Sequence, residues 1–109
     1  MCVFCKIANH KQQEEDIIYE DNDVFVVPSI CPVAEIHLLI IPKEHIGSVT
    51  DLSEQNINLM GHMILIAKKM AEEKDLNKKG YKLAINVGHG GGQVVDHLHL
   101  HLLGGGGLK

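Results

Sequence analysis

Residues 95–103 read Val-Asp-His-Leu-His-Leu-His-Leu-Leu, a stretch in which histidine and leucine alternate. Alternate side chains of a β-strand share a face, so this pattern predicts a strand with His97, His99 and His101 on one face and leucines in the opposite layer. A plain polar strand face is one interpretation. Three rings that titrate near neutrality, in strict alternation, favour instead a metal site or a nucleophilic imidazole.

A glycine-rich segment, Gly88-His89-Gly90-Gly91-Gly92-Gln93, precedes the histidines. Glycines let the backbone approach a ligand closely, and successive N–H groups in such a turn can bind an anion. The same residues also suit an ordinary hairpin turn. Beside the alternating histidines, the segment indicates a phosphate site.

Four other runs of β-forming residues predict strands. Asp21-Asn22-Asp23 separates two of them and favours a hairpin turn. A third run contains His37 and lies between Pro32 and Pro42. Proline suits the ends of strands, so these prolines indicate where this strand is bounded. With the histidine stretch, the five predicted strands cover residues 16–20, 24–27, 36–41, 81–87 and 95–103.

One long stretch has the apolar spacing of an amphipathic helix. Its start is expected at a cap, Asp51 or Ser53, and its end before Gly80. Apolar residues recur at steps of three and four: Ile57, Met60, Ile64, Ala67 and Ala71. Three methionines, Met60, Met63 and Met70, could furnish an apolar interface on it. The elements predict an α+β domain, a five-stranded, largely antiparallel sheet covered by this helix on one face.

Length and charge narrow the class of protein. A chain of 109 residues fits a single domain, 1–109, whose glycine-rich tail, Gly104–Lys109, is expected to be flexible. A net charge of -4 provides no broad positive field for a nucleic-acid polymer or an anionic membrane. Three cysteines without a secretory signal favour a reducing compartment, so we expect a cytoplasmic protein.

Several landmarks together resemble the histidine triad (HIT) family. They occur in the family's order and span Cys2 to Gly105: Cys2–Ile7 (CVFCKI), Ile40–His45 (IIPKEH), Asn77–Tyr81 (NKKGY), Gly92-Gln93 and His97–Leu103 (HLHLHLL). The resemblance is strongest to the nucleoside phosphoramidate hydrolases. It implies a HIT-like fold, a homodimer, and hydrolysis of purine nucleoside phosphoramidates of the adenosine monophosphoramidate type through a nucleotidylated histidine.

The resemblance also implies roles for individual residues. His99 would be the nucleophile, because burial keeps an imidazole neutral and able to attack phosphorus. His101 would stabilise charge or assist protonation of the leaving group, and His97 and His37 would fix the tautomer of His99. The remaining nucleotide-binding positions are those for phosphate, Asn86, Gly92 and Gln93, and those beside base and ribose, in the segment Pro28-Ser29-Ile30.

Two positions depart from the family pattern. Ser29 stands where an aspartate commonly receives the ribose hydroxyls, and Val94 stands where a hydroxyl commonly touches the phosphate. Val94 offers only its backbone N–H, and a missing donor at developing charge typically costs about 2 to 4 kcal/mol of transition-state stabilisation. A slow enzyme is expected.

The two cysteines Cys2 and Cys5 form a C-x-x-C pair, which is half of a tetrahedral zinc site. Some bacterial relatives complete the site with the histidines found here as His45 and His97, so a structural zinc is one expectation. Two reduced cysteines packed against the core are the alternative. Catalysis itself is expected to need no metal or other cofactor.

Three other functions remain open from the sequence. A weakly active or non-catalytic nucleotide-binding protein fits the departures at Ser29 and Val94. A dinucleoside polyphosphate hydrolase would use the same nucleophile. A metal site at the triad itself would use His99 or His101 as a ligand.

Overall fold

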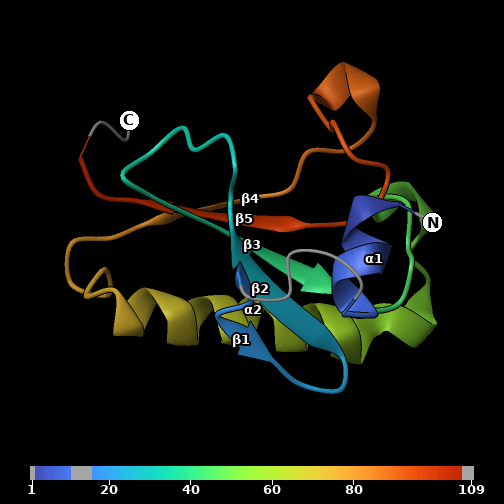
Figure 1. Ribbon diagram of the computed structural model, residues 1–109, viewed down its shortest axis with the longest axis horizontal. Helices are drawn as coiled ribbons and strands as arrows, with labels where there is room; N and C mark the ends of the chain where they lie inside the picture. Colours follow the sequence, from blue (N-terminus) through green and yellow to red (C-terminus); the bar gives the residue numbers. More distant parts are fainter. Residues whose placement is uncertain (1, 11–15, 107–109) are drawn as a thin grey trace.

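The computed structural model describes residues 2–10 and 16–106, and its centre is one antiparallel sheet (Figure 1). The strands are β1 (Tyr19–Glu20), β2 (Val24–Pro28), β3 (Ile36–Pro42), β4 (Lys82–Ala84) and β5 (Leu100–Gly104). Their order in the sheet is β1-β2-β3-β5-β4, and each neighbouring pair is antiparallel. This arrangement confirms the predicted five-stranded sheet.

The turn between β1 and β2 is made by Asp21. Its Oδ1 accepts hydrogen bonds from the N–H groups of Asp23 at 2.7 Å and Val24 at 2.9 Å. An aspartate that binds the backbone ahead of it is a common way to close a tight turn. The predicted hairpin is confirmed, with a first strand of only two residues.

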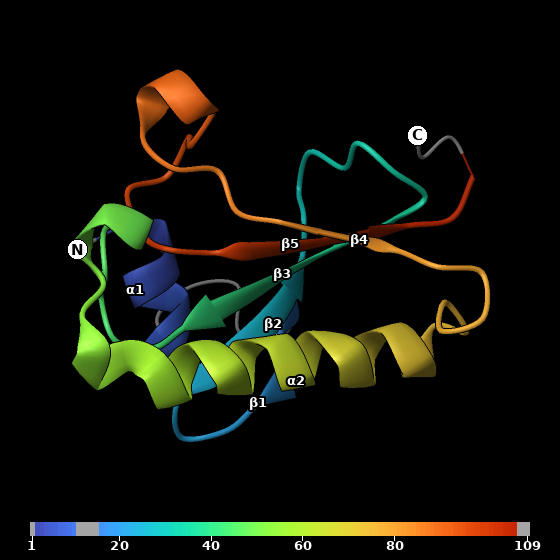
Figure 2. The same cartoon turned by 180° about the vertical axis from the view of Figure 1, so that it is seen from behind.

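The long helix, α2 (Ile57–Glu73), covers one face of the sheet (Figure 2). It begins later than predicted, because two 3-10 turns, Val49–Asp51 and Glu54–Asn56, precede it. Asp51 caps the first of these turns by accepting from the N–H of Ser48, and Ser53 begins the second. The core between α2 and the sheet contains Leu38, Ile40, Leu100 and Leu102 from the strands and Met63, Ile66 and Met70 from the helix. Two of the three methionines expected at an interface, Met63 and Met70, are thus buried in the chain's own core.

A short helix that the sequence analysis did not predict, α1 (Val3–Ala8), packs on the other face of the sheet. Cys2 caps it, since the Cys2 Sγ accepts from the N–H of Cys5 at 3.3 Å. Phe4 and Ile7 join a second apolar cluster with Phe25, Val27, Leu39 and Ile41. The expectation that only one face is covered is therefore wrong, because α1 supplies apolar side chains to the second face.

The histidine stretch is a strand only in its second half. β5 begins at Leu100, where Ile40 pairs with Leu100, and Leu39 pairs with His101. Before that point the backbone turns: the N–H of His97 donates to the carbonyl of Val95, and the N–H of Leu98 donates to that of Ile46. The predicted strand over 95–103 is therefore too long at its start. The strand predicted over 81–87 is likewise reduced to β4, residues 82–84.

The first residues of the segment expected to be flexible contact the rest of the fold. Gly104 ends β5 and is buried, and a side chain there would lie 2.6 Å from Leu76 Cδ1. The N–H of Gly106 donates to the Glu35 carboxylate at 3.1 Å. The rest of the predicted tail, residues 107–109, lies outside the described residues. Among the helices of residues 2–10 and 16–106, none has the length and apolar character to cross a membrane.

Candidate active site

The three triad histidines lie on the sheet face that carries α1, opposite the leucines that face α2. Leu98, Leu100 and Leu102 belong to the core beneath α2. The rings of His99 and His101 meet at 4.9 Å between centroids. His97 is fully buried, His99 is 7% exposed and His101 is partly exposed. The shared face predicted for the histidines is present, although only His101 lies within β5.

Two backbone carbonyls set the tautomers of His97 and His99. A carbonyl oxygen only accepts, so the His99 Nδ1 must donate to the carbonyl of His97, 2.7 Å away. The His97 Nε2 likewise donates to the carbonyl of Pro42 at 2.8 Å. In the neutral rings, the His99 Nε2 and the His97 Nδ1 therefore keep their lone pairs. A free Nε2 lone pair is what a nucleophilic imidazole requires.

A chain of hydrogen bonds fixes the tautomer of His101 in the same way. The N–H of Val33 donates to the His37 Nδ1 at 3.1 Å, so the proton of neutral His37 is on Nε2. That Nε2 donates to the His101 Nδ1 at 2.9 Å, which leaves the His101 Nε2–H as an outward donor. Burial, helped by the neighbouring His99, lowers the pKa of both rings, that of His101 to about 4. Both are therefore neutral near pH 7.

Gln93 holds the glycine loop in place. Its Oε1 accepts from the N–H of Gly88 at 2.9 Å, and its Nε2 donates to the carbonyls of Gly47 at 2.7 Å and Val95 at 2.9 Å. The side chain is only 4% exposed, so its polar groups are satisfied inside the protein. The amide that the sequence analysis assigned to phosphate therefore shapes the loop in this structure.

The other loop positions have similar internal roles. The Asn86 Nδ2 donates to the carbonyl of Gly91 at 2.8 Å, and the N–H of Gly92 donates to that of His89 at 3.0 Å. Gly92 has a φ of +89°, a conformation that glycine adopts without strain. These bonds form one 3-10 turn, His89–Gly91, that stands away from the sheet (Figure 1).

The positions expected beside the base and ribose, Ser29 and Ile30, and the position that lacks a hydroxyl, Val94, make few contacts with the rest of the site. Ile30 is 83% exposed and Val94 is 88% exposed. The Ser29 Oγ accepts from the N–H of Cys31 at 3.2 Å and so closes a local turn. No hydrogen bond or ring contact within residues 2–10 and 16–106 ties these three side chains to the triad.

Three surface cavities, of about 730, 450 and 320 Å³, are lined by residues outside the histidine row. The largest lies where α2 ends and β3 begins, against Glu35, Lys74 and Tyr81. In the single chain, the triad therefore meets solvent on the sheet face, at the exposed part of His101 and the 7% of His99 that is accessible.

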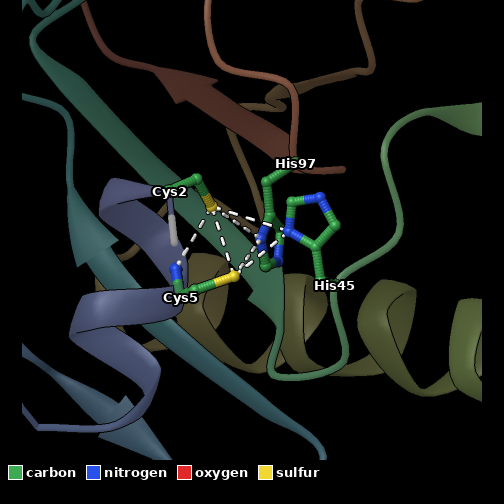
Figure 3. A group of neighbouring side chains, drawn as sticks. All are labelled: Cys2, Cys5, His45 and His97. Carbon is green, nitrogen blue, oxygen red and sulfur yellow. Dashed lines mark hydrogen bonds between the residues drawn. The ribbon is translucent and has the colours of Figure 1, made fainter.

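The predicted metal ligands converge beside the triad (Figure 3). The donor atoms of Cys2, Cys5, His45 and His97 all lie within 4.8 Å of one another. Helix α1 supplies the sulfurs, and the segment after β3 and the turn before β5 supply the imidazoles. The second such group, Asp21, Asp23 and His62, lies at the β1–β2 turn. His99 and His101 are in neither group, which argues against a metal held by the triad itself among the described residues.

The spacing of these donors fits a tetrahedral zinc ion. Zinc–sulfur bonds of about 2.3 Å and zinc–nitrogen bonds of about 2.0 Å place sulfurs about 3.8 Å apart and sulfur and nitrogen about 3.5 Å apart. Here the two sulfurs are 3.3 Å apart, and the four sulfur–Nδ1 distances run from 3.1 to 3.6 Å. The His97 Nδ1 has the lone pair that a ligand needs. Burial beside Cys2 raises the pKa of the Cys5 thiol, an effect that a bound cation would reverse.

Three contributors to the site were not predicted from the sequence. Phe4 packs its ring edge-on against His97 and His99, with centroids 5.7 and 5.2 Å apart. The N–H of Val33 and the carbonyl of Pro42 set histidine tautomers. Backbone groups leave no mark in a sequence. The i, i+3 spacing of Phe4 and Ile7 around the C-x-x-C pair is the one signal that could have indicated α1.

Comparisons with known proteins agree with this geometry. The family model described as scavenger mRNA decapping enzyme C-term binding matches residues 1–106. The purine nucleoside phosphoramidase of Escherichia coli is 41% identical over 103 residues, which cover 94% of this chain and 86% of the relative. A HIT family hydrolase from Legionella pneumophila superposes with a TM-score of 0.92 at 42% identity, covering 100% of this chain and 96% of its own. A zinc-bound histidine triad family protein from Mycobacterium smegmatis gives a TM-score of 0.81 at 33% identity, covering 99% and 78%. The chain belongs to the histidine triad family of hydrolases, in the branch that includes nucleoside phosphoramidases.

Proposed function

We propose that this protein hydrolyses purine nucleoside phosphoramidates through a covalent intermediate on His99. The observation that carries the proposal is the tautomer of His99: its Nδ1–H is held by the carbonyl of His97, so its Nε2 lone pair is free. The name of the Escherichia coli relative, a purine nucleoside phosphoramidase, supports the substrate class. The ring of His101 lies beside this nucleophile, where it can serve the leaving group.

In the first step, the His99 Nε2 attacks the α-phosphorus and the bond from phosphorus to the leaving nitrogen breaks. His101 directs its Nε2–H to the substrate, because its Nδ1 accepts from His37. An anionic phosphate nearby raises the pKa of His101, so the ring can bind a proton and pass it to the departing amine. The products of this step are the free amine and a nucleotidyl group on His99.

In the second step, water attacks the same phosphorus and the bond to the His99 Nε2 breaks. The His101 Nε2, which gave up its proton to the amine in the first step, accepts the proton that the water loses, and a nucleoside monophosphate is released. The His97 carbonyl keeps the His99 Nδ1–H in place through both steps, so the ring returns in its starting tautomer. Neither step requires a metal ion.

The loops beside the triad would bind the nucleotide less tightly than loops that have the family's usual aspartate and hydroxyl at positions 29 and 94. The N–H of Val94 donates to no atom of the described residues and is the amide we assign to the phosphate. The Ser29 hydroxyl is the acceptor available to the ribose, and Ile30 offers an exposed apolar side chain to the base. Asn86, Gly92 and Gln93 would act by shaping the loop that presents this amide.

We also propose that a structural zinc ion is held by the four-residue group Cys2, Cys5, His45 and His97. Their spacing supports it, as does the zinc-bound relative from Mycobacterium smegmatis. The ion would join α1 to the segments that contain His45 and His97. It supplies cross-linking only, because its four ligands leave no open position for a substrate.

A homodimer in the cytoplasm completes the proposal. Strand β4 is an edge of the sheet, and α2 exposes Ile57, Ile64 and Leu65, which are 67, 44 and 63% accessible. Neighbouring exposed apolar side chains are typical of an interface. Cys2, Cys5 and Cys31 form no disulfide with one another, which is compatible with the proposed reducing compartment.

Mass spectrometry after brief exposure to an adenosine phosphoramidate tests the proposed chemistry. We expect wild-type protein to gain one adenylyl group and His99→Asn to gain none, with turnover lost by at least about 10³-fold because a nucleophile is removed. His62→Asn is the matched control, since His62 lies on α2 and binds Asp21 away from the triad. Equal turnover by wild type and His99→Asn would exclude His99 as the nucleophile.

Measurements of nucleotide binding and of turnover separate the alternative functions. Binding of adenosine monophosphate without turnover of any phosphoramidate would identify a non-catalytic nucleotide-binding protein, the function favoured by the departures at Ser29 and Val94. Faster turnover of dinucleoside polyphosphates than of phosphoramidates would identify a dinucleoside polyphosphate hydrolase.

A further inference from the structure

His97 is shared between the zinc group and the proposed nucleophile. Its side chain points its Nδ1 at Cys2, 3.3 Å from the sulfur, and its Nε2–H at the carbonyl of Pro42. Its own carbonyl, two residues before His99 in the chain, accepts the proton that sets the tautomer of His99. Any movement of the His97 backbone therefore changes the hydrogen bond that orients His99.

Helix α1 reaches the same two histidines from the other side. It has only six residues, too few to be stable without tertiary contacts. Its two sulfurs face His45 and His97, with Cys5 Sγ 3.1 Å from the Nδ1 of His45 (Figure 3). The ring of Phe4, between the two cysteines, touches His97 and His99 with interplanar angles of 86° and 72°.

We infer that the group Cys2, Cys5, His45 and His97, when it holds zinc, clamps α1 against the triad so that Phe4 fixes the ring plane of His99. Phe4 is then a positioning residue, and occupancy of the metal group sets the rate at which His99 attacks. The inference rests on the proposed function, because it takes His99 as the nucleophile. The inference goes beyond the proposed function because the zinc cross-link, which takes no part in the reaction, then affects its rate.

The physical basis is the narrow geometry that attack on phosphorus requires. A nucleophile misplaced by about 1 Å can lose about 10²-fold in rate. Edge-on aromatic contacts favour one ring orientation by about two- to tenfold beyond the effect of burial. Without the clamp, α1 loses its link to His45 and His97 and depends on the apolar contacts of Phe4 and Ile7. His99 keeps its bond to the His97 carbonyl and its contact with the His101 ring, but the Phe4 ring against it is less constrained.

The experiment compares zinc-loaded and metal-free protein, for wild type and for Phe4→Leu. We expect removal of zinc from wild type to slow adenylyl transfer to His99 at saturating phosphoramidate by about tenfold, while the Kd for adenosine monophosphate changes less than about threefold. Phe4→Leu should bind one zinc per chain and show the slow transfer already when loaded. Removing its zinc should then slow transfer no further. Equal transfer rates in loaded and metal-free wild type would overturn the inference.

Phe25→Leu is the matched control. Phe25 belongs to the same buried apolar cluster as Phe4, but no ring contact joins it to a histidine among the described residues. This variant should lose stability and keep the full zinc dependence of the transfer rate. Loss of the zinc dependence in Phe25→Leu as well would show that general packing, and not the Phe4 contact, conveys the effect.

A readout without substrate keeps this inference separable from the proposed function. Histidine ¹⁵N spectra of the ligand-free protein report the tautomer of His99 directly. Zinc-loaded wild type should show one sharp Nδ1–H signal for His99. Metal-free wild type and loaded Phe4→Leu should show this signal broadened, because the ring then reorients about its bond to the His97 carbonyl. If no adduct forms in any sample, the proposed function fails, yet these spectra still decide the clamp. Spectra that do not respond to zinc or to Phe4→Leu overturn it.

Discussion

At the scale of single residues, the proton on each histidine follows from its neighbours. His37 and His101 are neutral because burial lowers their pKa values, and one N–H, that of Val33, determines which nitrogen of each carries the proton. Two neutral rings can share this hydrogen bond, because His37 has the proton and His101 the lone pair. Two charged rings at 2.9 Å would repel each other.

The lowered pKa of His101 predicts a loss of stability in mild acid. Between its ordinary value of 6.5 and its folded value of about 4, the unfolded chain takes up a proton that the folded chain rejects. Stability is therefore fully present above pH 6.5 and falls as the pH decreases toward 4, by at most about 3 kcal/mol from this ring. We expect His101→Asn, whose amide oxygen can still accept from His37, to flatten this dependence.

Urea unfolding of metal-free protein at about pH 7 and about pH 4.5 measures this difference. Thr50→Asn is the control, because Thr50 is exposed and neither residue is titratable, so the pH dependence should be unchanged. The interpretation is wrong if wild type and His101→Asn lose the same stability between the two pH values.

The sequence predicted which residue types gather at the site, but not all of their partners. Alternation placed His97, His99 and His101 on one face, and it did so correctly because the leucines between them enter the core. It gave no indication that the carbonyl of Pro42 or the N–H of Val33 would set the tautomers, since a backbone group is the same at every position. Ser29, Ile30 and Val94 stay predictions from the family pattern.

At the scale of elements, the glycine loop depends on one buried side chain. Gln93 is the only residue in the loop whose side chain both donates to and accepts from its backbone surroundings within the described chain. Gln93→Glu keeps the acceptor for the N–H of Gly88 and removes both donors. We expect it to lower the free energy of unfolding by about 2 to 3 kcal/mol, because two carbonyls then face a carboxylate.

Urea unfolding measures this loss, with Gln55→Glu as the control at an exposed position. The control should change stability by less than about 0.5 kcal/mol. A similar small change in Gln93→Glu would show that the loop does not rely on the two donated bonds.

Element boundaries were less predictable than element types. The hairpin, the central strand and the long helix were all confirmed, because each has a clear apolar period or turn residues. Helix α1 was missed, since six residues are too few for a helical period to show. The strand over 95–103 was overextended, because the bond from the N–H of Leu98 to the carbonyl of Ile46 depends on the loop after β3, which no local pattern reveals.

At the scale of the whole molecule, the exposed apolar side chains of α2 predict how two copies meet. Leu65→Glu places a charge on this face at a position that is 63% exposed in the single chain. We expect sedimentation to show a dimer for wild type and a monomer for Leu65→Glu at the same concentration. Burial of an unpaired carboxylate in an apolar interface is costly in free energy, so the charge introduced by Leu65→Glu should disfavour association of the two chains.

Thr50→Glu is the control for this experiment, since Thr50 is exposed in the 3-10 turn before α2. It should remain a dimer. A wild-type protein that sediments as a monomer, or a Leu65→Glu variant that stays dimeric, would show that this face is not the interface.

The position of α1 also affects how the protein is made. Cys2 and Cys5 leave the ribosome before their partners, because His45 follows about 40 residues later and His97 about 50 residues after that. At about 5 to 20 residues per second, the two thiols wait several seconds for their imidazole partners. Helix α1 is therefore synthesised before the segments that complete the group, and it docks only after they follow. In that interval its sulfurs are open to other metals and to oxidants in the cell.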